Sequence, residues 1–361
     1  MKKNILLFSS VEWNWMKQRP HFLAIEMAEQ GHSVVYLAIN PQKNRNEQLL
    51  NNLWLCEISN VRGYMRAGVM RFVARCKIAL RLRKRPVDVV ILTNPVQLQM
   101  LPERIRKRAV LIYDCMDLIP AFYTGKRRAL VENMEKILCC RADGITVSSS
   151  VLRQHITERY QVPLEKTALI CNALSPKDCL EAAHSPQTQN MKHPAMIYMG
   201  SVDRWLDLQT LERFMTSQSK WYLYIAGNAK PEIAKRLKMI PNCILLGQLD
   251  HLEALRYVNS ADVALLPFVT GGLVDMVDPV KLYEYLALNK PVVSTYWPAL
   301  NHFRALGRIL FYRDQNDFAQ QLEAAQRTAT VNNTEIEAFI QENDWKKRAK
   351  DMVEFIVRKS G

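Results

Sequence analysis

The sequence predicts an α/β protein with two doubly wound, parallel-sheet domains. Short apolar runs rich in Val, Ile and Leu recur along the whole chain of 361 residues and alternate with helical segments, which is typical of buried parallel strands joined by crossover helices. The runs form two series, separated at 172–194 by a stretch with three prolines and little periodicity. A chain of this length is also long enough to bury two cores.

The first series predicts five strands and the second predicts five more. The strands of the first series lie at 4–9, 33–39, 87–92, 110–114 and 144–148, and those of the second at 195–199, 221–226, 243–246, 263–267 and 291–294. Helical periodicity is clear at 20–30 and 128–140. We therefore expect a first domain at 1–175, a linker at 176–193, a second domain at 194–343 and a C-terminal amphipathic helix at 344–361.

The most informative stretch, 274–295, reads as a helix entrance, a helix and a buried strand. Asp278 and Pro279 are a natural helix start, because aspartate caps free backbone N–H groups and proline is tolerated in the first turn. Asn289 suits the C-terminal cap. Lys281 and Glu284 lie three residues apart, on what we expect to be a polar face. A helix N-terminus with a lysine in its first turn favours an anion, and diphosphate is the expected ligand.

The residues D-P-V-K-L-Y-E-Y-L-A-L-N-K-P-V-V-S-T (278–295) resemble the donor-binding signature of GT-B glycosyltransferases of the family-4 type. The segment 241–268 resembles the strand, helix and strand that precede this signature. The resemblance implies two Rossmann-like domains facing a central cleft, a UDP- or GDP-sugar donor, no cofactor, and a C-terminal helix that crosses back to the first domain. It assigns Glu284 to the donor ribose. The alternative is an ordinary amphipathic helix with a Lys/Glu pair on its solvent face.

Ligands of open parallel sheets bind outside the carboxyl ends of the strands, which selects the loops that follow each strand. In the second domain these hold Gly200, Ser201 and Arg204 after one strand, and Gly227 and Asn228 after the next. Glycine lets a ligand approach the backbone and arginine can hold a diphosphate. We predict donor contacts at these residues and a catalytic role for Arg204 in stabilising the leaving group; turn chemistry alone is the alternative.

In the first domain the loop after the first strand reads S-S-V-E-W-N-W-M-K-Q-R-P. Aromatic rings stack on sugars and arginine binds anionic groups, so Trp13, Asn14 and Arg19 are predicted acceptor contacts, with local packing as the alternative. The string W-x5-R-P and the helix after it resemble a subgroup of bacterial glycosyltransferases that build cell-surface polysaccharides such as teichuronic acid.

Two acids, Asp114 and Asp117, follow another strand of the first domain. A carboxylate beside the cleft can orient an acceptor hydroxyl or accept its proton. We predict acceptor binding by Asp114 and a catalytic role for Asp117; helix capping or a turn is the alternative.

The sequence departs from the family pattern at two positions. Retaining members often carry a glutamate eight residues before the ribose-binding one, where this chain has Met276, and an arginine followed five residues later by lysine, where Arg204 is followed by Gln209. Retention of anomeric configuration is therefore open. No D-x-D motif marks a metal site, and we expect none.

The net charge of +14 is concentrated in the first half of the chain. Residues 1–190 hold 28 Lys and Arg against 16 Asp and Glu, a charge of +12, and residues 62–85 hold nine basic residues and no acid. An apolar stripe at Met65, Val69, Phe72, Cys76 and Ala79 predicts a helix with this stripe against the core. The opposite face would meet an anionic membrane through a patch made of Arg62, Arg66, Arg71, Arg75, Arg81 and Arg83. Nucleic acid, the rival partner of a basic surface, is not expected, because no nucleic-acid motif accompanies the charge.

Eight cysteines are scattered without metal-ligand spacing, which favours reduced, mostly buried thiols and a cytoplasmic location. Taken together, the sequence predicts a membrane-peripheral glycosyltransferase at the inner face of the plasma membrane, with a lipid-linked or polysaccharide acceptor. A nucleotide-sugar epimerase of the same fold and a non-catalytic assembly partner remain as alternatives.

Overall fold

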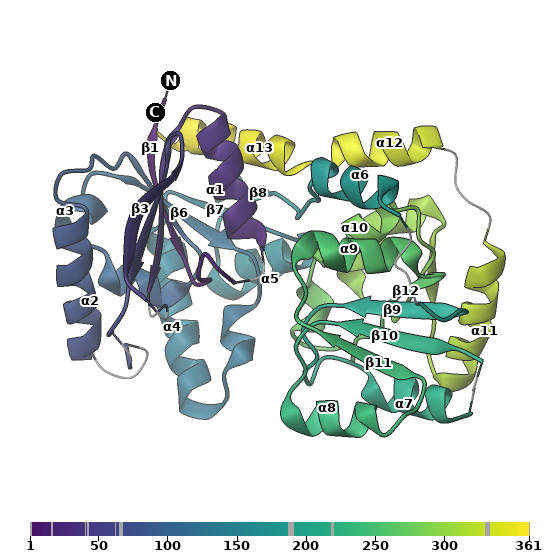
Figure 1. Ribbon diagram of the computed structural model, residues 1–361. Helices are drawn as coiled ribbons and strands as arrows, with labels where there is room; N and C mark the ends of the chain where they lie inside the picture. Colours follow the sequence, from purple (N-terminus) through teal and green to yellow (C-terminus); the bar gives the residue numbers. More distant parts are fainter. Residues whose placement is uncertain are drawn as a thin grey trace. The chain divides into compact units, whose positions relative to one another are not determined.

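A computed structural model describes residues 2–15, 17–39, 41, 43–61, 63–64, 68–186, 191–217, 220–328 and 333–360. The chain divides into two compact units (Figure 1). Unit 1 comprises Met1–Asn172 and Trp345–Gly361, and unit 2 comprises Ala173–Asp344.

Unit 1 is built on an eight-stranded sheet in the order β3-β4-β2-β1-β5-β6-β7-β8. Its strands are β1 (Asn4–Ser9), β2 (Ser33–Ile39), β3 (Arg45–Leu50), β4 (Leu53–Ile58), β5 (Val89–Leu92), β6 (Val110–Cys115), β7 (Gly144–Val147) and β8 (Thr167–Leu169). Every neighbouring pair is parallel except β3 and β4, which form an antiparallel edge. The central strands are buried on both faces, as their near-continuous apolar sequences predict.

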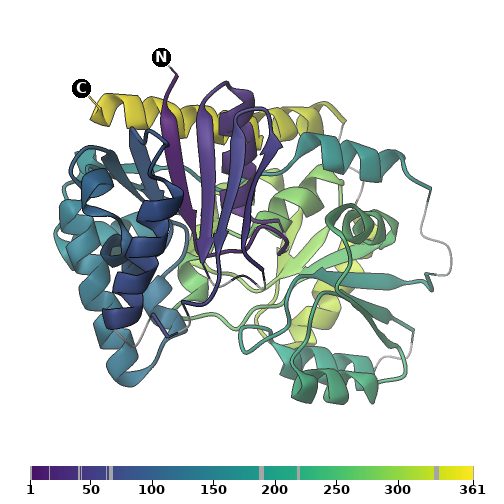
Figure 2. The same ribbon diagram turned by 60° about the vertical axis from the view of Figure 1, so that its left-hand side comes forward.

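Six α-helices of unit 1 belong to the described residues. They are α1 (Arg19–Glu29), α2 (Gly68–Arg81), α3 (Glu103–Arg106), α4 (Gly125–Arg141), α5 (Ser150–Tyr160) and α13 (Trp345–Lys359). The last of these comes from the far end of the chain and lies beside α1 (Figures 1 and 2). The rings of Phe22 on α1 and Trp345 on α13 stack with centroids 5.2 Å apart, so two apolar faces close over each other within this unit.

Unit 2 is built on a wholly parallel six-stranded sheet in the order β11-β10-β9-β12-β13-β14. Its strands are β9 (Ala195–Met199), β10 (Tyr222–Ala226), β11 (Cys243–Gly247), β12 (Val263–Leu266), β13 (Val292–Ser294) and β14 (Ile309–Phe311). Its α-helices are α6 (Pro176–His184), α7 (Leu208–Ser217), α8 (Pro231–Lys238), α9 (His251–Ser260), α10 (Val280–Ala287), α11 (Gln315–Arg327) and α12 (Asn333–Glu342). Figure 1 shows α6, α9 and α10 on one face of the sheet and α7 and α8 on the other, and α11 packs beside α7. Helices on both faces make the sheet doubly wound.

Helix α2 reverses the burial that its sequence predicts. Within the described residues, the side chains of Val69 and Phe72 are 72% and 60% exposed, and Cys76 and Ala79 are exposed too. The core contacts come instead from Ala74 and Ile78, which lie one helical turn apart. The helix carries apolar residues on two faces, and the face with Ala74 and Ile78 is the one that is buried.

We expect stability measurements to separate these two faces. Ile78→Ala removes buried methyl and methylene groups and should lower the free energy of unfolding by about 2 to 5 kcal/mol. Phe72→Ala, on the outer face of the same helix, should change it by less than about 0.5 kcal/mol. Urea unfolding of both variants measures the difference, and a larger loss for Phe72→Ala would contradict the orientation of α2.

Candidate active site

The entrance of α10 differs in detail from the expected helix start. The helix begins at Val280, and Pro279 occupies the N-cap position without a side-chain cap. The expected cap, Asp278, is only 3% exposed, and its carboxylate accepts a hydrogen bond from the Tyr283 hydroxyl at 3.0 Å. Asp278 therefore ties the loop before α10 to the second turn of the helix.

Lys281, in the first turn of α10, lies against an aromatic surface. Its Nζ is 4.5 Å from the ring centroid of Tyr198 and 5.3 Å from that of Phe268, and it donates to the Tyr198 hydroxyl at 3.2 Å. A cation over aromatic faces keeps its charge while part of its hydration shell is replaced by the rings. The ammonium group is thereby held at the carboxyl end of β9.

Two glycines at the carboxyl ends of β9 and β10 leave room for this arrangement. A Cβ on Gly200 would lie 2.3 Å from the Lys281 Nζ, and a Cβ on Gly227 would lie 2.1 Å from the carbonyl oxygen of Gly200. Both residues also have positive φ, +135° and +155°, which side chains disfavour. At Gly227 the clash is with backbone, so only glycine fits there. At Gly200 the obstacle is the movable end of Lys281, and the positive φ is what favours glycine.

The other predicted donor residues surround these strand ends. Ser201 accepts hydrogen bonds at its carbonyl from Tyr198 and Trp205. Arg204 is exposed, and Asn228 is exposed and donates to Gln248 at 2.7 Å. The carbonyl of Asn228 also accepts from the backbone N–H of Val202 at 2.8 Å, which joins the two loops. Unit 2 therefore brings Gly200, Ser201, Arg204, Gly227, Asn228 and Lys281 to one edge of its sheet.

The sequence pattern suggested that Glu284 lies on a solvent-facing side of the helix. The residue is instead buried and only 3% exposed. Its Oε1 is 2.7 Å from Nε2 of His251 on α9, and Nδ1 of the same ring is 3.3 Å from Oδ2 of Asp178 on α6. Burial of the ring opposes its protonation, but the charges and hydrogen bonds of Glu284 and Asp178 prevail and raise the pKa of His251 to about 10. Sequence reasoning missed both partners; the only signal was a histidine directly after Asp250, the N-cap of α9.

In unit 1, Arg19 and Asp114 form a buried ion pair. The Arg19 guanidinium donates two hydrogen bonds of 2.9 Å to the Asp114 carboxylate, and the two side chains are 3% and 1% exposed. Asp114 also accepts from Thr146 on β7 at 2.7 Å, and Arg19 donates to the carbonyl of Ile170 after β8 at 2.8 Å. The pair joins several strand ends, and its predicted contact with an acceptor stays a prediction.

Trp13 and Asn14 lie in the loop between β1 and α1. The Trp13 ring packs against Tyr36 and His21 with centroids 5.0 and 5.3 Å away, and its backbone N–H donates to Glu57 at 3.1 Å. Asn14 is exposed and accepts from Arg45 at 3.1 Å. Arg45 and Glu57 come from the unexpected strands β3 and β4, which support this loop.

Asp117 follows β6 and is half-buried. Loss of hydration raises the pKa of its carboxyl group to about 7, with nearby Asp114 adding to the rise and Arg19 opposing it. Within the described part of the chain, the carboxylate of Asp117 has no hydrogen-bond partner, unlike that of Asp114. A carboxyl group whose pKa lies near neutrality can exchange protons at physiological pH.

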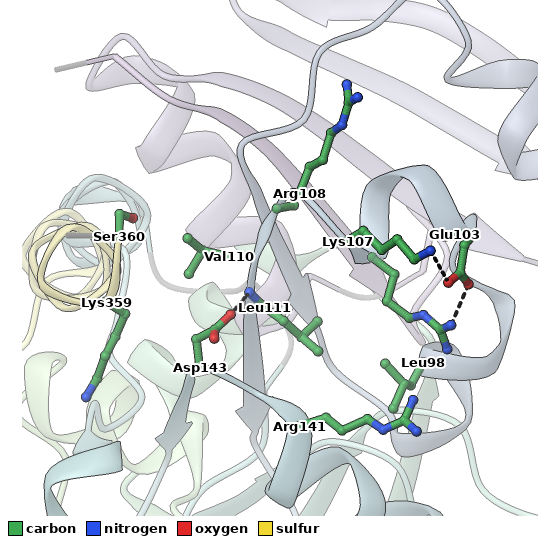
Figure 3. A pocket seen from close by; sticks show the side chains of 12 residues that line it. Leu98, Glu103, Lys107, Arg108, Val110, Leu111, Arg141, Asp143, Lys359 and Ser360 are labelled. Carbon is green, nitrogen blue, oxygen red and sulfur yellow. Dashed lines mark hydrogen bonds and ion pairs between the residues drawn. The ribbon is translucent and has the colours of Figure 1, made fainter.

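A cavity of about 600 Å³ lies at the edge of the unit 1 sheet where the parallel strands begin, opposite the edge that holds Asp117. It is lined by residues of α3, the start of β6 and the ends of α4 and α13 (Figure 3). Glu103 is ion-paired there with Arg106 and Lys107, while Arg108 and Arg141 extend in different directions. These cations do not converge on one point, so we place no ligand there.

Neither a metal centre nor a membrane-spanning helix occurs among the described residues. No group of three or more His, Cys, Asp or Glu side chains could hold a metal ion. Among the same residues, no helix has both the length and the apolar character needed to cross a bilayer.

Comparisons with known proteins match both units. The family model described as Glycosyltransferase Family 4 matches residues 21–178, and the one described as Glycosyl transferases group 1 matches residues 194–327. The chain is 26% identical over 201 residues to the candidate teichuronic acid biosynthesis glycosyltransferase TuaH of Bacillus subtilis strain 168. The match covers 52% of this chain and 51% of TuaH, so the chain spans about half the length of the curated relative it matches.

Solved structures resemble the fold over nearly the whole chain. A sucrose-phosphate synthase from Thermosynechococcus elongatus has a TM-score of 0.74 at 14% identity, with 99% of each chain covered. An Escherichia coli trehalose-6-phosphate protein bound with UDP-2-fluoro glucose has a TM-score of 0.73 at 11% identity, with 98% of each chain covered. At such identities the likeness concerns the fold, and it confirms the expected α/β, GT-B architecture.

Proposed function

Since the chain is a GT-B glycosyltransferase of the family-4 and group-1 type, we propose that it moves a sugar from a nucleotide-sugar donor to an acceptor in bacterial cell-surface polysaccharide biosynthesis. The similarity to TuaH supports this choice of pathway class. The observation that carries the donor site is the close approach of Gly200, Gly227 and Lys281 at the carboxyl ends of β9 and β10.

The proposed donor site stabilises a leaving nucleoside diphosphate. Lys281 and the N-terminus of α10 supply positive charge, the glycines give access to the backbone, and Arg204 and Asn228 lie in the loops beside them. Ser201 follows Gly200, Asp278 fixes the loop before α10, and Glu284 accepts hydrogen bonds from the ribose. The donor is a UDP- or GDP-sugar, and displacement passes through an oxocarbenium-like state.

We expect Glu284→Ala to weaken nucleotide binding by about 1 to 3 kcal/mol, the range for hydrogen bonds to a charged group. Isothermal titration calorimetry with UDP and GDP measures the change. The matched control is Glu232→Ala on exposed α8 of the same unit, which should leave the affinity unaltered. Equal affinities of Glu284→Ala and the wild type would reject the ribose role.

The acceptor is proposed to bind along the loops of unit 1. Trp13 offers an aromatic surface, Asn14 an exposed amide, and Asp117 a carboxylate that accepts the proton of the attacking hydroxyl. Arg19 and Asp114, the other two predicted acceptor contacts, are buried in their ion pair and hold the loops that carry this surface. The acceptor class is a lipid-linked or polysaccharide chain.

The pH profile of transfer tests Asp117. A base must be deprotonated, and the raised pKa of about 7 places its titration near neutrality. We expect kcat/KM to fall as the pH drops below about 7, and Asp117→Asn to lose both activity and this acidic limb. Nucleotide affinity, which unit 2 provides, should be unchanged in this variant. An acidic limb that persists in Asp117→Asn would exclude the assignment.

We further propose that the enzyme is cytoplasmic and attaches to the inner face of the plasma membrane through α2. The exposed side chains of Val69, Phe72 and Leu80 lie on a helix whose polar residues are all basic or uncharged. This is the composition of an interfacial helix on anionic lipid.

The predicted basic patch is only partly described by the structure. Two of its residues, Arg62 and Arg66, lie outside the described residues. Arg71 and Arg75 are half-buried and donate to the carbonyls of Tyr64 and Gln99. Arg81 and Arg83 are exposed, and they are the charges assigned to lipid headgroups.

Vesicle binding tests the membrane contact. Each arginine near an anionic surface contributes about 1 kcal/mol, so the Arg81→Gln, Arg83→Gln double variant should bind phosphatidylserine vesicles about thirtyfold more weakly. Phe72→Ser should weaken binding through the apolar contact instead. A charge-matched control replaces Lys235 and Lys238 on α8 with Gln. If the control lost as much affinity as the α2 variant, net charge and not this surface would explain attachment.

A further inference from the structure

Three helices of unit 2 meet at one ionic cluster. Asp178 lies in the first turn of α6, His251 is the first residue of α9, and Glu284 lies in α10. The imidazole ring bridges the two carboxylates, 2.7 Å from Glu284 and 3.3 Å from Asp178. The exposed fractions of the side chains rise outward, from 4% for Glu284 to 17% for His251 and 22% for Asp178.

The bridge fixes the protonation of the ring and the place of the carboxylate. An ionised carboxylate only accepts hydrogen bonds, so each ring nitrogen facing one must carry a proton. The ring is therefore an imidazolium, in keeping with its raised pKa of about 10. A carboxylate as buried as Glu284 needs a compensating charge, and the imidazolium supplies it through Oε1.

We propose that His251 is the positioning residue for the donor ribose: it holds Glu284 through Oε1, and the second carboxylate oxygen accepts from the ribose hydroxyls. This inference rests on the proposed nucleotide-sugar site. Asp178 in turn orients the ring from the opposite side, as carboxylates orient histidines in metal and catalytic sites. The ribose contact thus depends on α6 and α9 as well as on α10.

A ribose-dependent loss of affinity distinguishes positioning from general support. His251→Phe keeps a ring but removes both N–H donors, and it should weaken binding of UDP or GDP by about tenfold or more. The 2′,3′-dideoxy forms of the same nucleotides cannot use Glu284, so they should bind the variant and the wild type equally. His251→Gln keeps an amide N–H donor for Glu284 but not the positive charge, so it should lose affinity for the ribose forms, though less than His251→Phe does.

Non-additivity provides a second measurement. If His251 acts through Glu284, the double variant of His251→Phe and Glu284→Ala should bind no more weakly than Glu284→Ala alone. The matched control is His184→Phe, which changes an exposed histidine on α6. Thermal melting checks that each variant is folded, and if His251→Phe does not fold, Asp178→Asn and His251→Gln replace it in the same comparison.

The outcomes separate this inference from the proposed function. If the wild type binds no nucleotide, the donor site itself is wrong. If Glu284→Ala discriminates between ribose and dideoxyribose but the His251 variants do not, only the positioning role falls. An equal loss for ribose and dideoxyribose ligands would likewise overturn the inference, because it would show that His251 supports the unit as a whole.

Discussion

The buried ion pair between Arg19 and Asp114 is the interaction on which the carboxyl edge of unit 1 depends. It connects the start of α1 with β6 and, through Thr146 and the carbonyl of Ile170, with β7 and the end of β8. Removing one partner of such a pair leaves an uncompensated buried charge, at a cost of about 3 to 5 kcal/mol. The loops that carry the proposed acceptor residues are thus anchored by a contact that is itself out of reach of solvent.

Unit 2 also holds charged side chains in place by pairing and burial near the ends of its strands. The buried carboxylate of Glu284 is compensated by the His251 imidazolium, and the ammonium group of Lys281 is held over the rings of Tyr198 and Phe268. In both units a charged side chain has a fixed orientation before any substrate arrives. Preorganised charge of this kind is what stabilises a developing negative charge without reorganisation at the moment of reaction.

The sequence predicted the secondary-structure elements that are marked by a pattern of neighbouring residues. Strands β1, β2 and β9 have the expected bounds, because uninterrupted apolar runs identify buried parallel strands. The polar strand β3 and the three-residue strands β8 and β14 carried no such signal. The outward stripe of α2 was misassigned because periodicity finds an apolar face without saying what covers it. The partners of Glu284 and Asp114 are 33 and 95 residues away in the chain, so only the folded structure brings them together.

The glycine pair at the ends of β9 and β10 limits how this protein can diversify. The space that a side chain at Gly227 would need is filled by the Gly200 backbone, and the space at Gly200 is filled by Lys281. Neither position can accept a larger residue while its neighbours stay in place. Related chains that keep this arrangement are therefore expected to differ at exposed positions beside it, such as Arg204 and Asn228, and to keep glycine at both strand ends.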